Sequence, residues 1–275
     1  MLPALDDLCV RSNLRLCPLS ATLRRSVMTF GAFISRVSGA LIAGSLAFTL
    51  IFAAVHGAED QRKVTVVSFG LFGGQGVFRR EATGAAEIVA NRFGADQVVV
   101  RFNTKTGGDA TVEALAATLQ AEAKKMNGDR DILFLILTSH GSQEGLAVNA
   151  GRSAETLKPS NLAVMLTRTG IRYKVIIISA CYSGVFIPPI ADADTLVVTA
   201  ADANHSSFGC EDKAKWTYFG DAFFNTALRQ TSNLKEAFLL ARSLVSKREL
   251  RQGFEPSHSQ MAGGGNVEPL LVARR

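Results

Sequence analysis

The chain has 275 residues, of which 47% are hydrophobic and 20% are charged, and its formal net charge is +6. This composition excludes a disordered protein, which would carry fewer apolar residues and more charge. The length is sufficient to bury a substantial core in one or two domains. No block of basic residues interleaved with aromatic ones stands out, so the sequence does not support nucleic-acid binding.

Residues 1–58 are predicted to be a leader. Arg24, Arg25 and Arg36 precede the charge-free stretch 37–58. Basic residues followed by an apolar run are typical of an export signal, and this run is also long enough to span a bilayer. The sequence leaves open whether the run is a cleaved signal peptide or an uncleaved membrane anchor.

Both alternatives predict the same location for the rest of the chain. The arginines stay on the cytoplasmic side, so residues 59–275 are expected outside it. The protein is then periplasmic or extracellular, either free or associated with the membrane through residues 37–58. The start is left open between Met1 and Met28.

From Lys63 onward, apolar segments alternate with helical patterns, which is typical of a parallel sheet covered by helices. Ile132–Leu137 and Val175–Ile178 show no alternation of apolar and polar positions, as expected of strands buried on both faces. The strands are predicted at Lys63–Gly70, Gln97–Phe102, Asp131–Thr138, Tyr173–Ala180 and Thr195–Ala201. Helices are predicted at 81–93, from a cap at Asp109 to about Met126, after a cap at Ser160, and at 218–229 and 234–247. The tail from Arg251 contains Gly and Pro, and Gly263–Gly265 is predicted to be a loop.

Reactive side chains follow two of the predicted strands at their carboxyl ends. His140 and Gly141 follow one strand, and Cys181 follows another. Ligands bind at that end of the strands in open α/β sheets, so neighbouring strands would bring an imidazole and a thiol together. These two groups are the minimum for cysteine nucleophilic catalysis, because the thiolate attacks and the histidine activates it.

Each of these residues has a simpler interpretation when taken alone. A cysteine after an apolar strand is most often a small buried hydrophobe, and a lone histidine is more often structural. Their pairing at matching strand ends is what favours catalysis. His205 and His258 do not end a strand, so they are expected at the rim or surface. No spacing typical of zinc ligands occurs, and no metal or other cofactor is expected.

Two of the four cysteines, Cys181 and Cys210, lie in the folded part of the sequence. Outside the cytoplasm they could form a disulfide, which would abolish a nucleophilic role for Cys181. A reactive thiol and a separate buried thiol are the favoured interpretation, because disulfides need close and well-aligned Cβ atoms.

Four blocks of the sequence resemble the legumain-like cysteine peptidases of the caspase-like superfamily. TSHGS and SACYSG are similar to the two catalytic motifs of this family. TAADANHSSFGC…WTYFGD (199–221) resembles the segment after the nucleophile, and FRREA (78–82) resembles the segment after the first strand. The blocks occur in the family's order, and the resemblance spans about Lys63 to Leu228.

The resemblance implies a caspase-like three-layer α/β/α sandwich with a mostly parallel central sheet. It also implies an endopeptidase with protein or peptide substrates. Cys181 would be the nucleophile, His140 the acid–base group, and the backbone amides of Gly141 and Cys181 the oxyanion donors. No third member of a triad is evident, and the family is usually described as having a dyad.

By motif position, Arg79, Ser206 and Asp221 match residues that line the primary pocket of asparagine-specific family members. An Arg and an Asp facing each other across a pocket could bond both ends of an amide side chain. Ser179 and Arg80 depart from the family, which has Glu and His at these positions. The sequence therefore predicts a preference for asparagine, or for aspartate, before the scissile bond.

Three alternatives remain at this point. A transpeptidase would use the same acyl-enzyme with an amine as the acceptor. A catalytically silent α/β interaction domain is disfavoured by the pair of His140 and Cys181. A flavodoxin-like phosphate binder is disfavoured because the glycines between Gly70 and Gly76 have neither the Rossmann nor the P-loop spacing.

Overall fold

The computed structural model describes residues 62–272. The predicted leader and the segment 37–58, on which the predicted location depends, lie outside the described residues. Within residues 62–272, no helix has the length and apolar character needed to span a membrane.

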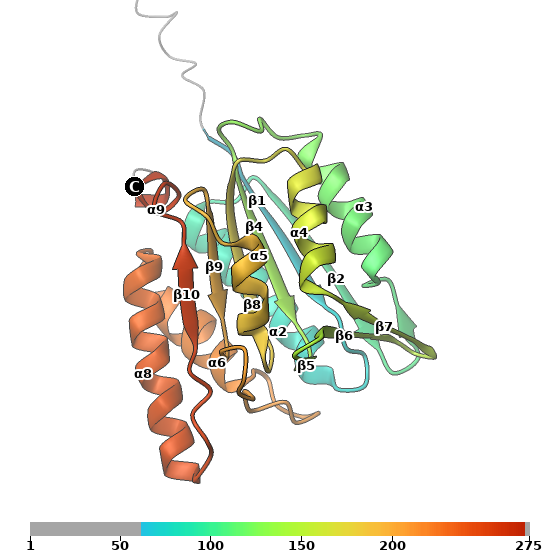
Figure 1. Ribbon diagram of the computed structural model, residues 1–275, viewed down its shortest axis with the longest axis vertical. Helices are drawn as coiled ribbons and strands as arrows, with labels where there is room; N and C mark the ends of the chain where they lie inside the picture. The colour runs from blue at the N-terminus through green and yellow to red at the C-terminus, as the bar shows by residue number, and fades with distance from the viewer. Residues whose placement is uncertain (1–61, 273–275) are drawn as a thin grey trace, which may run out of the picture. The chain divides into compact units, whose positions relative to one another are not determined.

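A seven-stranded sheet forms the centre of the fold, with strand order β10-β9-β8-β4-β1-β2-β3 (Figure 1). Its strands are β1 (Val64–Gly70), β2 (Gln97–Thr104), β3 (Gly107–Gly108), β4 (Ile132–Thr138), β8 (Tyr173–Ser179), β9 (Thr195–Thr199) and β10 (Gln260–Gly263). The five inner strands run parallel, and only the edge strands β3 and β10 are antiparallel to their neighbours. The predicted mostly parallel sheet is therefore confirmed.

Helices cover both faces of the sheet. One layer contains α3 (Val112–Ala123), α4 (Pro159–Arg168), the 3-10 turn η1 (Ser183–Phe186) and α5 (Ile187–Ile190). The other contains α2 (Gly76–Phe93), α8 (Leu234–Gln252), α9 (Glu268–Val272) and a continuous run of α6 (Tyr218–Gly220), π-helix η2 (Asp221–Ala227) and α7 (Leu228–Gln230). Successive residues of the inner strands enter opposite cores; Phe134, for example, packs in one core and Leu135 in the other. This alternation explains why β4 is apolar from Ile132 to Leu137, since the side chains on both of its faces are buried.

A small three-stranded sheet follows β4 and was not predicted. It consists of β5 (Gly141–Ser142), β6 (Gly145–Ala150) and β7 (Ser153–Leu157), paired antiparallel. Leu146, Val148 and Leu157 are buried and join the core that contains α3 and α4. The hairpin lies at the end of the main sheet where β4 and β8 terminate (Figure 1).

Two predicted helix caps are wrong. Thr111 caps α3, because its hydroxyl accepts a hydrogen bond from the Ala114 amide at 3.0 Å, whereas Asp109 pairs with Arg101. Lys158 is the cap residue of α4, so Ser160 already lies within the helix, whose first turn contains Pro159.

Two element boundaries also differ from the predictions. Helix α2 begins at Gly76, five residues before the predicted start, so it includes part of the glycine-rich segment. In the predicted tail, Gln260–Gly263 forms β10 against β9, and this includes Gly263, which was predicted to lie in a loop.

Candidate active site

The ends of β4 and β8 bring the predicted catalytic residues together. These strands pair in parallel, with Thr138 opposite Ser179, and the Ser139 amide donates to the Ser179 carbonyl at 3.2 Å. His140 and Cys181 each follow two residues after this matched pair. The two side chains therefore emerge from adjacent strands at the same level of the sheet.

Gly141 packs directly on the backbone of Cys181. A Cβ atom at this position would lie 2.1 Å from the carbonyl oxygen of Cys181 and 3.3 Å from the Cβ of Ala180. No other residue can make this approach without moving the backbone. Glycine is thus required here to bring the two strand ends into contact.

Cys181 is partly buried, and three polar groups of Ser207 contact its sulfur. The thiol lies 3.3 Å from the Ser207 carbonyl oxygen, and the Ser207 amide donates to the sulfur at 3.2 Å. The Ser207 hydroxyl lies 3.7 Å from the same atom. These contacts hold Sγ against the loop that follows β9.

The chain turns sharply after Cys181. Tyr182 has φ = 55°, in the left-handed region, and its amide donates to the carbonyl of His205 at 2.9 Å. Ser183 closes the turn, with its hydroxyl bonded to the carbonyl of Ala180 at 2.8 Å and accepting from the amide of Ala201 at 3.1 Å. Non-glycine residues in this conformation are uncommon and cluster at functional sites.

His140 lies in an aromatic environment with a neutral polar partner. Its ring packs edge-on against Phe72 and Phe78, with centroids 4.7 and 4.9 Å away. Its Nε2 lies 2.7 Å from Oε1 of Gln75, in the loop that precedes α2. Burial lowers the pKa of His140 below its usual value, because desolvation disfavours the charged ring.

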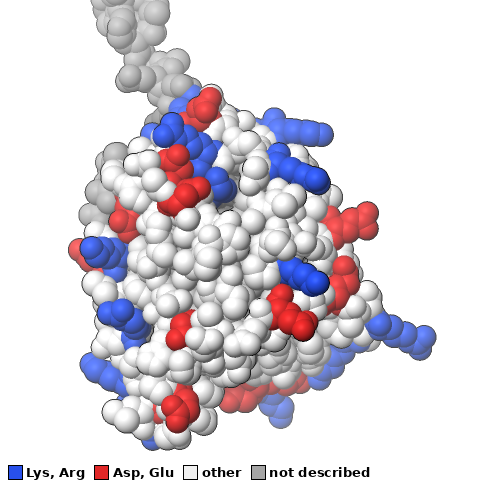
Figure 2. Space-filling model, in the orientation of Figure 1, with Lys and Arg blue, Asp and Glu red and all other residues white. Residues whose placement is uncertain are grey.

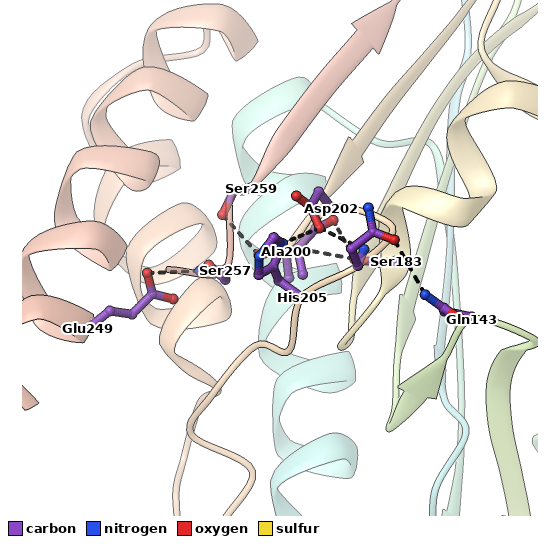
Figure 3. Close-up of polar contacts among 10 residues, drawn as sticks. Gln143, Ser183, Ala200, Asp202, His205, Glu249, Ser257 and Ser259 are labelled. Atoms are coloured by element: carbon purple, nitrogen blue, oxygen red, sulfur yellow. Dashed lines mark hydrogen bonds and ion pairs between the residues drawn. The ribbon is translucent and has the colours of Figure 1, made fainter. Parts of the chain in front are cut away.

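His205 lies in the loop after β9, within a polar network (Figure 3). Its Nδ1 is 2.7 Å from Oδ1 of Asp202, which also accepts from the Asn204 amide at 2.7 Å. Burial alone would raise the pKa of Asp202, but the hydrogen bonds from Asn204 and His205 outweigh it, so the pKa is lowered. His258, with φ = 54°, packs edge-on against His205 at 4.7 Å between centroids.

The same network connects this loop to α8. The amide of Asp202 donates to the Ser257 carbonyl at 3.0 Å, and the Ser257 amide donates to the carboxylate of Glu249 at 3.2 Å. On the opposite side, Gln143, in the turn between β5 and β6, donates to Asn204 at 3.3 Å. The network thus fixes the loop after β9 between α8 and the hairpin (Figure 3).

Cys181 and Cys210 are both free thiols. Burial, with smaller contributions from Cys181, Glu81 and Glu211, raises the pKa of Cys210 to about 12. A thiol with such a pKa stays protonated and is a poor nucleophile. The two domain cysteines therefore form no disulfide in this structure, and Cys210 is unsuited to attack.

The predicted pocket residues are not all brought together. Arg79 lines a pocket of about 540 Å³ with Lys105 and Asp212, and its guanidinium lies 5.7 Å from the Phe102 ring centroid. Among residues 62–272, this guanidinium has no hydrogen-bond or ion-pair partner. Ser206 lies next to Ser207 and therefore close to the thiol.

Asp221 lines a different pocket, against α8. Its carboxylate accepts a hydrogen bond from Asn225 at 2.9 Å and lies 3.6 Å from a guanidinium nitrogen of Arg248. The prediction that Asp221 and Arg79 face each other across one pocket is therefore wrong for this structure. The reason is that Asp221 begins a π-helical turn whose next turn and neighbouring helix provide its partners.

Four residues that touch the site were not singled out from the sequence. Gln75 bonds His140, Ser207 surrounds the thiol, Asp202 bonds His205, and Glu81 is buried behind the strand ends. In the sequence, Gln75 is one polar residue in a glycine-rich segment, and Glu81 resembles an ordinary helix charge. Only their three-dimensional contacts distinguish them.

On the face shown in Figure 2, basic and acidic side chains are interspersed around a largely uncharged centre. This face lacks the continuous basic stripe that is typical of nucleic-acid binding. Over the described part of the chain, no group of three or more His, Cys, Asp or Glu side chains could hold a metal ion.

Comparisons with known proteins identify the family and the fold of the chain. The sequence model of the peptidase C13 family matches residues 106–264. Caspase-1 from Spodoptera frugiperda has a similar structure, with a TM-score of 0.50 and 16% identity, covering 74% of this chain and 87% of that chain. At this identity the structural likeness concerns the fold alone, and it confirms the predicted caspase-like sandwich. No curated protein sequence matches the chain.

Proposed function

The chain belongs to the peptidase C13 family, and on this premise we propose that it is a cysteine endopeptidase with Cys181 as nucleophile and His140 as acid–base group. Family membership and the caspase-like fold support a cysteine peptidase in general terms. The assignment of the two residues rests on one observation. The register of β4 and β8 sets His140 and Cys181 at the same level on adjacent strands, with Gly141 packed against the Cys181 carbonyl.

The hydrogen bond to Gln75 supports a defined role for each nitrogen of His140. If Nε2 donates to the amide oxygen of Gln75, then Nδ1 carries the lone pair that can accept the thiol proton. Among the described residues, His140 and Cys181 have separate hydrogen-bond partners. Catalytic hydrogen bonds are often long before substrate binds and shorten in the complex.

The reaction then proceeds through an acyl-enzyme. The Cys181 thiol transfers its proton to His140, and the sulfur attacks the substrate carbonyl carbon. The amides of Gly141 and Cys181 donate to the developing oxyanion. His140 returns the proton to the leaving amine as the peptide bond breaks, which leaves a thioester on Cys181. His140 then takes a proton from water as the water oxygen attacks the thioester carbon. The C–S bond breaks, the acid is released, and His140 returns the proton to the Cys181 sulfur.

We propose that the enzyme prefers asparagine or aspartate before the scissile bond. The Arg79 guanidinium, without a hydrogen-bond or ion-pair partner among the described residues, is available to a carbonyl or carboxylate oxygen of the substrate. Ser206 precedes Ser207, whose amide bonds the Cys181 sulfur, so Ser206 belongs to the segment beside the thiol. Asp221 is engaged with Arg248 and is not needed for this proposal.

A peptide-library cleavage assay on the full chain tests both parts. The residue before the scissile bond is varied, and products are identified by mass spectrometry. Cleavage after asparagine or aspartate is expected, together with its loss when Cys181 is replaced by alanine. Preference for basic or large apolar residues would overturn the specificity, and turnover without Cys181 would overturn the enzyme assignment. An added amine acceptor distinguishes transpeptidation from hydrolysis through the product mass.

A further inference from the structure

Glu81 is a buried carboxylate directly behind the proposed catalytic residues. The residue has no exposed surface. Oε1 accepts from the hydroxyl of Thr138 at 2.9 Å, and Oε2 accepts from the amide of Thr217 at 2.7 Å. The hydroxyl of Ser179 is a further hydrogen-bond partner. All of these donors are neutral.

The partners of Glu81 belong to the segments that carry the site. Thr138 and Ser179 are paired in the β4–β8 register, and His140 and Cys181 each follow two residues later. Thr217 caps the helical run that starts with α6, and its hydroxyl lies 3.1 Å from that of Ser179. One carboxylate on α2 therefore joins both strand ends and the start of a helix.

Two neighbouring contacts show how closely this region is fitted to α2. Gly220 faces the Glu81 carboxylate so closely that a Cβ atom there would lie 2.0 Å from Oε2. Arg80, the preceding residue of α2, donates from Nε to the carbonyl of Ala214 at 3.0 Å. Arg80 and Glu81, adjacent in α2, thus contact both the loop that contains Ala214 and the α6 helix that follows this loop.

An ionised carboxylate in this environment destabilises the folded state. Burial raises the pKa of Glu81, although the hydrogen bonds from Ser179, Thr217 and Thr138 act in the opposite direction. A buried acid without a cationic partner costs stability, and proteins retain such groups mainly where function requires them. An isosteric amide would fill the same volume without this cost.

We infer that Glu81 is a positioning residue of the active site, which fixes the ends of β4 and β8 so that His140 and Cys181 stay in register. This inference rests on the proposed function for its catalytic meaning. The contacts themselves do not involve the substrate, so the effect on Cys181 can be measured without any peptide.

Glu81→Gln is the first test. The amide oxygen can still accept from the Thr217 amide, and the amide nitrogen can donate to the hydroxyl of Thr138, so the fold is preserved. We expect kcat to fall roughly tenfold to a hundredfold, as for loss of a charge-assisted hydrogen bond, with KM changed by less than about threefold. The alkylation rate of Cys181 by iodoacetamide, located by mass spectrometry, should fall about tenfold.

Stability provides the readout that separates positioning from support. A raised pKa means that the folded state binds the Glu81 proton more tightly than the unfolded state. The wild-type protein therefore loses stability as pH rises from the unfolded value of 4.5 through the folded pKa. Glu81→Gln removes this loss, so its thermal midpoint at pH 7 should equal or exceed that of the wild type while its activity falls.

Glu122→Gln is the matched control. Glu122 is also buried, on α3, and pairs with Lys125 of the following turn at 2.7 Å. It lies near the chain segment that enters β4 rather than the end that leaves it. Its replacement should leave Cys181 alkylation and peptide turnover unchanged.

A reciprocal exchange, Glu81→Ser with Ser179→Glu, tests the location of the carboxylate. The Ser179 hydroxyl is bonded to Glu81, so a longer acid at position 179 can enter the volume vacated at position 81. The exchange should restore most of the alkylation rate that is lost in Glu81→Ser alone.

The outcomes are distinct. Unchanged Cys181 alkylation in Glu81→Gln would overturn the inference. It would also be overturned if stability and alkylation fell together and the exchange restored neither, because Glu81 would then be structural support only. If no variant, including the wild type, cleaves peptides, the proposed function fails, but slower alkylation restored by the exchange would still support the positioning role.

Discussion

His140 follows β4 and His205 lies in the loop after β9, and the surroundings of the two rings differ in kind. The ring of His140 packs between Phe72 and Phe78 and bonds the neutral amide of Gln75. The ring of His205 bonds the carboxylate of Asp202 within a network that extends to α8 (Figure 3).

An imidazole bonded to a carboxylate resembles two members of a catalytic triad, yet here it is not at a strand end. The Asp202 carboxylate bonds the amide of Asn204 and the ring of His205, and both contacts stabilise the conformation of the loop after β9. His140 follows β4 in register with Cys181, and its burial favours the neutral ring that a general base needs. We therefore propose His140 as the base because of its position on the sheet, although His205 is the histidine with an acidic partner.

Replacing the nucleophile should have the largest effect. Cys181→Ala removes only the sulfur from a partly buried position, so the fold should be retained while hydrolysis is abolished. Peptide turnover and thermal unfolding are measured on the same preparation. Turnover at the wild-type rate in this variant would exclude Cys181 as the nucleophile.

Replacing the two histidines should lower kcat by clearly different factors. His140→Ala should lower kcat by roughly 10²–10⁴, the usual contribution of general acid–base catalysis. His205→Ala should lower kcat by less than about tenfold, because it only loosens the loop whose carbonyl bonds the Tyr182 amide. Steady-state kinetics of both variants decide the matter, and the reverse order of effects would mean that His205 is the base.

The neutral partner of His140 provides a test of intermediate size. The lowered pKa of His140 predicts that kcat/KM of the wild type falls on the acid side with a midpoint below 6.5, since the neutral ring persists to lower pH. Gln75→Glu places a negative charge 2.7 Å from Nε2, which should raise the pKa and move this midpoint to higher pH. The pH–rate profiles of the two proteins are compared. Coincident midpoints would mean that His140 is not the group whose ionisation causes the fall in kcat/KM.

Asp221→Asn should have the smallest effect. Its ion pair with Arg248 is long and partly exposed on both sides, so its removal should cost about 0–1 kcal/mol of unfolding free energy. Asparagine cleavage should change less than about twofold, a change smaller than loss of one charged hydrogen bond would give. A specific loss of cleavage after asparagine, at unchanged stability, would mean that Asp221 does line the primary pocket and contacts the substrate side chain.

Much of the fold could be predicted because the inner strands carry an unmistakable pattern. The predicted strand Asp131–Thr138 differs by one residue from β4, and Tyr173–Ala180 differs by one residue from β8. Unbroken apolar runs fix where such strands stop, and therefore where His140 and Cys181 lie. Strand β10 could not be predicted, because its four residues show no periodic pattern and only pairing with β9 defines it.

The candidate site was only partly predictable for a different reason. His140 and Cys181 follow strands, so local patterns locate them, whereas Gln75, Glu81 and Ser207 act through contacts with distant segments. The direction of Asp221 depends on the π-helical turn that it begins and on its approach to α8. Motif position alone could not supply that direction, because a side chain's partners depend on packing.

The central claim is that Cys181 is a nucleophile activated by His140, and labelling with a peptide that carries a thiol-reactive group and a terminal asparagine tests it most directly. The adduct is located by mass spectrometry in the wild type, Cys181→Ala and His140→Ala. We predict a single adduct on Cys181, much slower labelling in His140→Ala, and none on Cys210, whose raised pKa of about 12 keeps it protonated. An adduct on Cys210, or equal labelling of Cys181 with and without His140, would contradict the claim.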